Sequence, residues 1–593
     1  MACRYEPALG LIPPHPEALP AAQRYARVPA GEVHGLHGLA LSPAGDLAYV
    51  ATPALDGVQV VRLPEGGVVQ RLVTGRGPRT LRRISRAPSA SGPDDAAPPR
   101  GPQSKAVPPA ELLLVTHLNG RELTAHELLP DGRLGPAVQR LQTAAPVQDV
   151  LALPPPSPTL LLLGHEDRRV DRAQPFVAGL DSVILPLPLR PGAGLPLDDP
   201  GPGQRRSLNL TERAGLAKLD AAVYDPARRR LVVAGAATDN LLLVEDDALG
   251  GGAALDPRAA SPLGRVVAVG ANPTALALLP DGRVAVAERL GDTVSLIDPA
   301  TTERETVIVG EPERRTAAER GELLFFSRRL FPHNVADGER SVYACSACHD
   351  DAHLDGRAHP ARQNRFFTQT RTCRGIAQTA PYLFIGELAD LTAFSASLLA
   401  SHAQGWERDP WNFDKYPVTL PAYGRRPHVT LSPAAVRAAM AAYLQTLVPE
   451  PSPFVPLGAT MLPAQARAGL GVFRARCASC HRLVRDSGTD QPVAEAELER
   501  ELLRGGVALT SLLRYRTGTP DLTPSGNNPP SLRGIWDSGP YFSDGSAGSL
   551  AEVLRRTHAD PSSPAVHAAA NAWPAPSLLP AEREALLAFL RCL

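Results

Sequence analysis

Methionine, cysteine and aromatic residues are scarce in this chain of 593 residues. It contains three methionines and seven cysteines, and aromatic residues make up 5% of it. The sequence has no run of ~18 uncharged apolar residues, so we expect no membrane-spanning helix. Sixty-one basic residues balance sixty-one acidic ones. This balance argues against a protein that binds nucleic acid through an overall basic field.

The apolar content of 44% is sufficient for packed cores, and the length suggests three or four domains. In residues 1–310, short apolar runs alternate with turns that contain Pro, Asp or Gly. Three such units begin at Leu39, Ala221 and Ala275. Each unit predicts a small sheet that must stack on its neighbours. The last unit resembles the YVTN-type β-propeller repeat. At ~40–45 residues per blade, we expect about seven blades.

Beyond residue 310 the spacing of apolar residues becomes helical, and Thr316 with Glu319 forms a capping-box pattern. Further helices are expected from Pro433, from near Pro463 and from Pro580. This part of the chain is duplicated. We name residues 316–448 copy one and residues 457–593 copy two, and we expect each to be an α-helical domain.

The duplication is clearest in three short segments that occur in both copies. The paired segments are Cys345-Ser346-Ala347-Cys348-His349 with Cys477-Ala478-Ser479-Cys480-His481, Arg374-Gly375-Ile376 with Arg533-Gly534-Ile535, and Ala380-Pro381-Tyr382 with Gly539-Pro540-Tyr541. Copy two carries an insertion, the charged stretch from about Glu495 to Arg504.

Cys-x-x-Cys-His is the attachment signal for c-type haem. Two thiols on one helical turn reach the two porphyrin vinyl groups, and the adjacent histidine ligates the iron. Chance gives roughly 0.002 such matches in a chain of this composition. We therefore predict two haem c groups, held by Cys345, Cys348 and His349 and by Cys477, Cys480 and His481, with His349 and His481 as proximal iron ligands. Copies one and two are then each expected to be an α-helical cytochrome c domain.

Two other uses of these cysteines are disfavoured. Zinc bound by the four motif cysteines would leave both following histidines unexplained. A disulfide-exchange motif would require a thioredoxin-like βαβ pattern, which the sequence does not show.

With these motifs, residues ~316–593 resemble the bacterial dihaem cytochrome c peroxidases and the related dihaem maturation enzymes. The resemblance implies that one haem accepts electrons and passes them to the other. It also implies that Arg374 and Arg533 pair with haem propionates. Trp536 is a candidate for a position between the haems.

The chain departs from this family where distal chemistry is expected. A family histidine after the Pro-Tyr segment is replaced by Leu383 or Phe384 in copy one and by Ser543 in copy two, and Thr392 stands where the peroxidases place an acidic residue. The distal ligand candidates are His402 and His558. His353, His359 and Met461 are further candidates, whereas Met440 is expected in the core.

Haem is attached outside the bacterial cytoplasm, so we expect an exported protein of the periplasm or cell envelope. Met1-Ala2-Cys3 resembles the end of a lipoprotein signal, which makes Cys3 a candidate lipid anchor. Cys373 and Cys592 would remain available to pair as a disulfide. The histidines of residues 1–310 form no recognisable ligand spacing.

The sequence therefore predicts an electron-transfer protein with a β-propeller in residues 1–310, which would bind a partner or ligand. The redox partner is a protein or a small-molecule acceptor. Two alternatives remain open, a peroxidase-like oxidoreductase and a propeller scaffold with decayed haem domains.

Overall fold

In the computed structural model the chain forms two compact units. The first takes in Met1–Glu166 and Asp181–Glu311, and the second takes in Asp167–Leu180 and Pro312–Leu593. The structure describes residues 8–11, 26–29, 36–85, 111–118, 121–143, 146–153, 159–167, 180–188, 207–245, 263–309, 315–330, 344–361, 366–383, 386, 388–392, 417–422, 427–456, 458–485, 491–509, 526–557 and 578–593.

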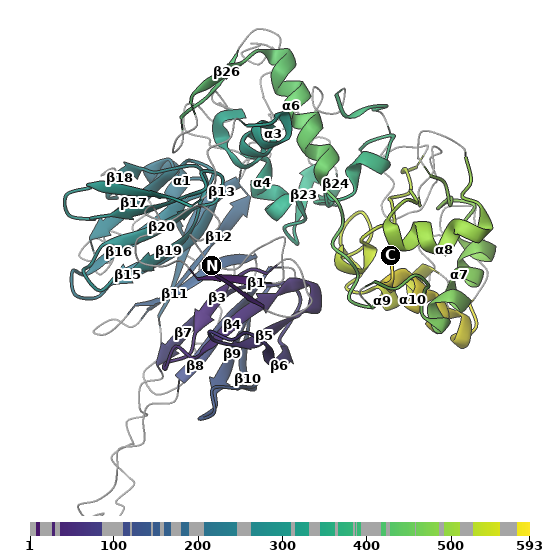
Figure 1. The fold of residues 1–593 in the computed structure, drawn as a ribbon, viewed down its shortest axis with the longest axis horizontal. Helices are drawn as coiled ribbons and strands as arrows, with labels where there is room; N and C mark the ends of the chain where they lie inside the picture. The colour runs from purple at the N-terminus through teal and green to yellow at the C-terminus, as the bar shows by residue number, and fades with distance from the viewer. Residues whose placement is uncertain are drawn as a thin grey trace, which may run out of the picture. The chain divides into compact units, whose positions relative to one another are not determined.

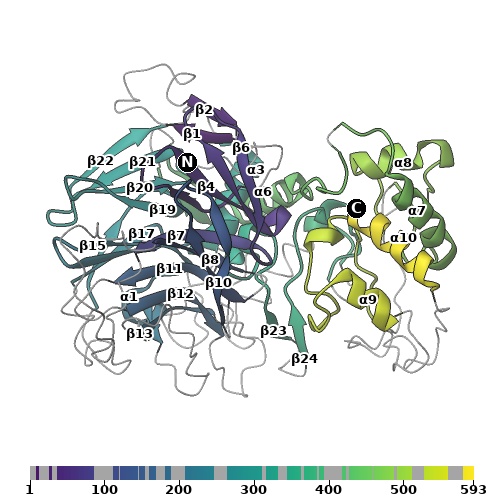
Figure 2. The same cartoon turned by 90° about the horizontal axis from the view of Figure 1, so that it is seen from below.

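The described part of the first unit forms a β-propeller of five four-stranded antiparallel blades (Figures 1 and 2). Their strands are β3 (Leu39–Leu41), β4 (Leu47–Thr52), β5 (Gly57–Arg62) and β6 (Val68–Val73); β7 (Pro78–Ser85), β8 (Glu111–His117), β9 (Glu122–Leu128) and β10 (Leu134–Gln142); β11 (Val147–Leu153), β12 (Thr159–Asp167), β13 (Leu180–Pro188) and β14 (Leu208–Asn209); β15 (Leu219–Asp225), β16 (Arg230–Gly235), β17 (Asn240–Glu245) and β18 (Arg265–Ala268); and β19 (Pro273–Leu278), β20 (Val284–Glu288), β21 (Thr293–Ile297) and β22 (Arg304–Ile308). A two-stranded sheet, β1 (Ala8–Leu11) with β2 (Ala26–Pro29), and helix α1 (Leu210–Ala214) complete the described elements of regular α and β structure in this unit.

The expectation of about seven blades is wrong, because the blades are not equal in length. The first and last blades, Leu39–Val73 and Pro273–Ile308, have the compact repeat that the sequence pattern predicts. The three between them contain long connections between their own strands, at residues 86–110, 189–207 and 246–264. A fixed repeat length counts these connections as additional blades.

Neighbouring blades are joined through a buried charge pair. The guanidinium of Arg82, on β7, donates from Nε to Oδ1 of Asp149, on β11, at 3.0 Å, and from Nη2 to the Ala222 carbonyl of β15 at 3.0 Å. The Ala222 amide donates to Oδ2 of Asp149 at 3.0 Å. Because the Asp149 side chain is fully buried, its charge depends on these donors. The three blades are thus fixed to one another by directional contacts as well as by packing of their apolar faces.

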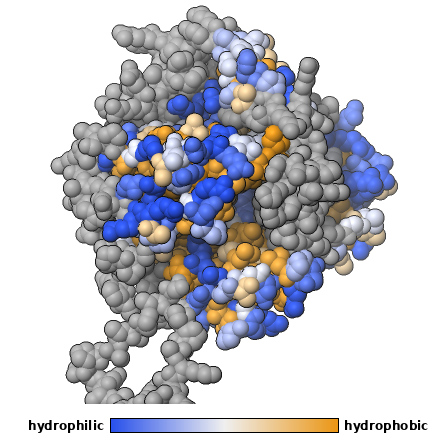
Figure 3. Space-filling model, turned by 60° about the vertical axis from the view of Figure 1, so that its left-hand side comes forward, coloured by the Kyte–Doolittle hydropathy of each residue, from blue (hydrophilic) through white to orange (hydrophobic). Residues whose placement is uncertain are grey.

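Some exposed apolar side chains of the propeller lie singly on the last strands of their blades or sheets, as Val73 on β6, Val138 on β10 and Val266 on β18 illustrate. On the face shown in Figure 3, orange and blue side chains are interspersed over the described surface. Scattered exposure of this kind is usual for a folded domain.

Each copy in the second unit is built on one pair of crossed helices. Copy one pairs α3 (Ala317–Phe326) with α6 (Pro433–Thr446), and copy two pairs α7 (Ala464–Arg476) with α10 (Pro580–Arg591), which lie side by side (Figure 2). The capping box of Thr316 and Glu319 is confirmed at the start of α3.

A glycine occupies the crossing point in both pairs. A Cβ on Gly321 would lie 2.6 Å from the Ala439 carbonyl carbon, and one on Gly469 would lie 2.6 Å from that of Ala585. Only glycine therefore allows the two helix backbones to approach this closely. The two crossing points also align the copies with each other. Ala439 corresponds to Ala585, so the next residues, Met440 and Leu586, occupy equivalent positions.

The remaining described elements of the second unit are shorter. They are η4 (Arg328–Leu330), α4 (Cys345–Cys348), η5 (Asp350–Ala352), β23 (Ala358–Ala361), β24 (Phe366–Gln369), η6 (Ile376–Gln378), β25 (Val418–Leu420), β26 (Val429–Leu431), α8 (Glu495–Arg504), η7 (Ile535–Asp537) and α9 (Leu550–Thr557). Helix α8 is the insertion expected in copy two, and it covers the core with Leu498 and Leu502.

The duplication extends to the backbone conformation. Gly375 and Gly534 have φ values of 78° and 67°, and Leu383 and Phe542 both have a φ of 69°. Leu383 and Phe542 share this left-handed conformation, so they occupy equivalent positions in the two copies. Ser543, the residue after Phe542, therefore corresponds in sequence to Phe384 and not to Leu383. Among the described residues, no helix is long and apolar enough to cross a membrane.

Candidate functional site

The first Cys-x-x-Cys-His motif forms a single helical turn. Helix α4 begins at Cys345 and ends at Cys348, and the amide of His349 donates to the Cys345 carbonyl at 2.9 Å. Cys348 is buried and Cys345 is half-buried. The turn therefore places both thiols and the imidazole in one short segment, as the sequence predicts.

The ring of His349 has a defined orientation. Its Nδ1 lies 2.8 Å from the Arg371 carbonyl oxygen, and its ring centroid lies 6.3 Å from that of Phe325 on α3. A carbonyl oxygen only accepts hydrogen bonds, so Nδ1 carries the proton. In the neutral ring the lone pair is then on Nε2, the arrangement found in metal-ligating histidines.

The second motif repeats this arrangement at the end of α7. The amide of His481 donates to the Cys477 carbonyl at 2.9 Å, and its Nδ1 lies 3.4 Å from the Leu509 carbonyl oxygen. The second hydrogen bond is longer, but it uses the same ring nitrogen. Both predicted proximal ligands are therefore held in the same tautomer.

The first thiol of each motif, on Cys345 and on Cys477, lies in surroundings that favour the neutral form. Burial, with smaller contributions from the neighbouring thiols of Cys373 and Cys348, raises the pKa of Cys345. Burial also raises the pKa of Cys477 to about 12. Disulfide-exchange enzymes need a thiol whose pKa is lowered. This environment therefore disfavours disulfide-exchange chemistry.

The structure does not form the disulfide considered for Cys373 and Cys592. Both residues are free thiols, and burial raises their pKa values to about 12 and about 11. Cys373 lies in copy one near Cys345, whereas the Cys592 sulfur lies 4.0 Å from the Phe454 carbonyl oxygen.

The matched arginines each contact the other copy. Arg374 lies 3.6 Å from Asp537 of η7, and Arg533 donates to the Gln378 side chain of η6. Gln378 and Asp537 occupy equivalent positions in the two copies, so the contacts are reciprocal. The expected pairing with haem propionates remains a prediction, and these protein partners are the groups with which propionates would compete.

Arg374 is the centre of a larger charge cluster between the copies. Besides Asp537, it lies 3.5 Å from Asp351 and 3.7 Å from Glu450. Nε2 of His353 lies 3.2 Å from the Asp537 carboxylate and its Nδ1 2.7 Å from the Thr372 hydroxyl. His353 is therefore part of the junction between the copies.

The distal ligand candidates are only partly within the described residues. His402 and His558 lie outside them, as does the possible anchor Cys3. Met461 is 53% exposed. Met440 is buried on α6, which confirms its place in the core. Thr392, which stands where the peroxidases place an acidic residue, donates its backbone amide to the Asp390 carboxylate at 2.8 Å.

The indole of Trp536 lies in η7, next to Asp537 of the charge cluster. Its Nε1 is buried and has no hydrogen-bond partner. The structure thus places Trp536 beside the junction of the copies, and its predicted position between two haems stays a prediction.

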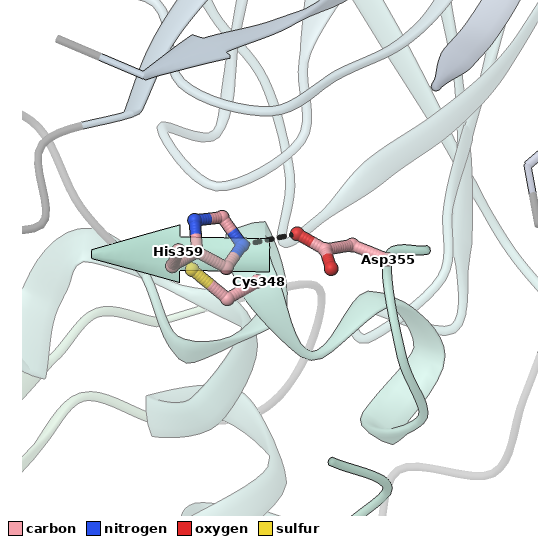
Figure 4. Close-up of side chains that lie close together, drawn as sticks. All are labelled: Cys348, Asp355 and His359. Carbon is pink, nitrogen blue, oxygen red and sulfur yellow. Dashed lines mark hydrogen bonds and ion pairs between the residues drawn. The ribbon is translucent and has the colours of Figure 1, made fainter. Parts of the chain in front are cut away.

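Sequence reasoning missed a buried cluster beside the first motif. The sulfur of Cys348, a ring nitrogen of His359 and a carboxylate oxygen of Asp355 lie within 4.8 Å of one another (Figure 4). Nε2 of His359 lies 2.7 Å from Oδ2 of Asp355. His359 was a candidate for its proximity to the motif, but nothing in the sequence singled out Asp355.

The described histidines of the propeller have structural roles. Thr124 bridges Nε2 of His117, at 2.9 Å, and Nε2 of His126, at 3.0 Å. His165 lies 3.4 Å from the Ser182 hydroxyl. His117, His126 and His165 thus hydrogen-bond to hydroxyl groups of their own blades.

Comparison with known proteins identifies no family. No family model matches the chain, and no curated protein matches its sequence. Among solved structures, hydrazine synthase of Kuenenia stuttgartiensis is 12% identical, with a TM-score of 0.32, over 51% of this chain and 77% of that chain.

Two further solved structures illustrate the range of likeness. A MauG-like protein associated with microbial copper homeostasis is 18% identical, with a TM-score of 0.31, over 48% of this chain and 90% of that chain. Virginiamycin B lyase from Staphylococcus aureus is 10% identical, with a TM-score of 0.24, over 47% of this chain and 72% of that chain. Likeness at this level carries no argument about activity.

Proposed function

We propose that this protein is a dihaem c-type electron-transfer protein, in which residues 316–448 and 457–593 each hold one haem. The observation that carries the proposal is the matched state of His349 and His481. Each follows two cysteines on one turn and donates Nδ1–H to a backbone carbonyl oxygen. This tautomer is the one that an iron-ligating histidine needs, because Nε2 then carries the lone pair.

The residues fit the group on their donor chemistry. Two thiols and one imidazole in five residues are the set that covalent haem attachment needs. The neutral thiols of Cys345 and Cys477 suit addition to a vinyl group, in which sulfur bonds to carbon and the thiol hydrogen passes to the other vinyl carbon. A bound haem would supply a one-electron couple that the side chains themselves lack.

The chain's own residues would orient and isolate that couple. The carbonyls of Arg371 and Leu509 hold each imidazole ring, which fixes its direction and strengthens it as a donor. The aromatic side chains of Phe325 and Tyr443 in copy one, and of Phe473 and Phe589 in copy two, form buried packing beside the motifs. Such packing excludes water, and a site without mobile water has a small reorganisation energy for electron transfer.

The reciprocal contacts between the copies would keep the two sites at a fixed separation. Arg374 with Asp537 and Arg533 with Gln378 join the segments that follow each motif. Electron transfer between two sites needs such a constant geometry. We propose that the five-bladed propeller binds the redox partner, and that the protein works in the periplasm or cell envelope, where haem is attached.

Optical spectroscopy on chain produced in a host competent for haem attachment tests this function. We expect two low-spin haems that do not respond to peroxide or cyanide. The Cys345→Ser/Cys348→Ser and Cys477→Ser/Cys480→Ser variants should each retain half of the haem, and Cys592→Ser, as a control, should retain all of it. A high-spin haem that consumes peroxide would instead support the peroxidase-like alternative. If either double-cysteine variant retained its full haem content, the assignment of that motif would be refuted.

A further inference from the structure

The buried cluster of Cys348, Asp355 and His359 offers three kinds of metal ligand at one point. The exposed fractions of the three residues are 7%, 2% and 9%. Among the residues that the structure describes, this is the one group of three His, Cys, Asp or Glu side chains close enough to share an ion. It comes from two elements, because Cys348 ends α4 and His359 lies on β23, as Figure 4 shows.

We propose that this cluster binds one zinc ion when no haem is attached to Cys348. Thiolate, imidazole and carboxylate together suit zinc better than magnesium or calcium, which prefer oxygen ligands alone. With ligand distances of about 2.0–2.3 Å, tetrahedral coordination places the donor atoms roughly 3.4–3.6 Å apart. The donor atoms now lie within 4.8 Å, so shifts of about an ångström bring them into place.

Binding would change the protons and hydrogen bonds of the cluster in a defined way. The zinc ion displaces the Cys348 thiol proton, because the thiolate is the ligand. The 2.7 Å hydrogen bond between Nε2 of His359 and Asp355 is replaced by two bonds to the ion. The proton on Nε2 moves to Nδ1 of the same neutral ring through solvent, because a ligating ring nitrogen carries no proton. Oδ1 of Asp355 keeps the Arg357 amide, at 3.0 Å, as its donor, which orients the carboxylate. Three protein ligands leave the fourth position for water.

Zinc and haem are alternative occupants of this part of copy one. A thioether sulfur carries no thiolate charge, so haem attachment at Cys348 removes the strongest zinc ligand. Copy two offers a matched comparison, since Cys480 occupies the equivalent position and belongs to no group of three such side chains among the described residues. The inference therefore applies to copy one alone, and it does not depend on the proposed electron transfer.

Zinc binding to the full chain, produced without haem-attachment machinery, tests the proposal. Equilibrium dialysis with Zn²⁺ should give one ion per chain for the wild type and for the controls Cys480→Ser and Cys345→Ser. Cys348→Ser should lose the ion, and His359→Ala and Asp355→Asn should bind it at least about tenfold more weakly, as expected for loss of one ligand. Retention of full affinity by Cys348→Ser, or equal loss in Cys480→Ser, would overturn it.

A second measurement guards against variants that fail to fold. Co²⁺ in place of Zn²⁺ in the wild-type chain should give an intense thiolate-to-cobalt absorption, and its absence would overturn the proposal without any variant. Chain with haem attached should bind no zinc at this cluster. If the protein binds zinc but never acquires haem in a competent host, only the proposed function is refuted. If it acquires two haems in that host but binds no zinc when produced without haem, only this inference is refuted.

Discussion

Replacing the glycine at the helix crossing of copy two should separate α7 from α10. A Cβ on Gly469 would lie 2.6 Å from the Ala585 carbonyl carbon, 2.8 Å from the Phe589 Cβ and closer still to the Ala585 oxygen. Two of these three contacts are with backbone, so no side-chain rotation relieves them. The Gly469→Ala variant therefore has to move the two helices apart.

The same helix supplies a matched control. A Cβ on Gly471 would have nothing within 4 Å. Both substitutions gain about 1 kcal/mol of helix propensity. Overpacking costs up to about 3 kcal/mol when backbone must shift. We therefore expect Gly469→Ala to destabilise copy two by about 2 kcal/mol and Gly471→Ala to stabilise it by about 1 kcal/mol.

Native-state hydrogen exchange reads these effects locally, which a global unfolding curve of a multidomain chain does not. Amides of α7 and α10 should exchange faster in Gly469→Ala and slower in Gly471→Ala. Gly321→Ala should have the same effect on α3 and α6, because its Cβ would lie 2.7 Å from the Tyr443 Cβ. Equal exchange in Gly469→Ala and Gly471→Ala would refute the helix crossing described here.

Three further substitutions test the charges and buried groups of the two units. Burial, together with the nearby His126, lowers the pKa of His117 to about 3. The unfolded chain then binds one proton more between pH 6.5 and 3, so propeller stability should fall by about 1.4 kcal/mol per pH unit as the pH falls. Native-state hydrogen exchange of the β8 and β9 amides in His117→Gln should show a pH dependence of stability that is smaller by that amount. Arg82→Met leaves the buried Asp149 carboxylate without its cation and should cost about 3–5 kcal/mol of propeller stability, measured by hydrogen exchange of the β7 and β11 amides. Arg133→Met, which breaks an exposed pair with Asp131, should cost less than about 1 kcal/mol in the same assay. Arg374→Gln removes the cation from three carboxylates and should weaken the junction of the copies by about 3 kcal/mol, measured as faster exchange of the Ile535–Asp537 amides. Arg533→Gln should have a smaller effect, because the cross-copy partner of Arg533 is the neutral Gln378. Equal effects of the two substitutions would contradict the charge cluster.

Local patterns predicted the elements that local forces determine. The unit that begins at Ala275 folds into strands and a tight turn as expected, because the Asp-Gly turn and the alternating apolar residues lie within one hairpin. The two Cys-x-x-Cys-His turns were likewise visible, since five consecutive residues carry the pattern. The helix starts at Pro433 and Pro580 followed from proline's fit to the first helical turn.

Features that depend on distant contacts were not predicted. The blade number was wrong because connections inside three blades obscure the repeat. The reciprocal pairing of Arg374 with Asp537 brings together residues far apart in the sequence. Asp355 reaches His359 and Cys348 through a turn in which Asp351 and Ala352 both have a φ of 56°, and an alanine gives no sequence signal for this left-handed conformation.

The central claim is that this chain carries two covalently bound haems. Intact mass spectrometry of chain from a host competent for haem attachment tests it most directly. We predict the polypeptide mass plus two haem groups, mapped by peptide digestion to Cys345 with Cys348 and to Cys477 with Cys480. A colourless protein with the mass of the bare polypeptide would contradict the account.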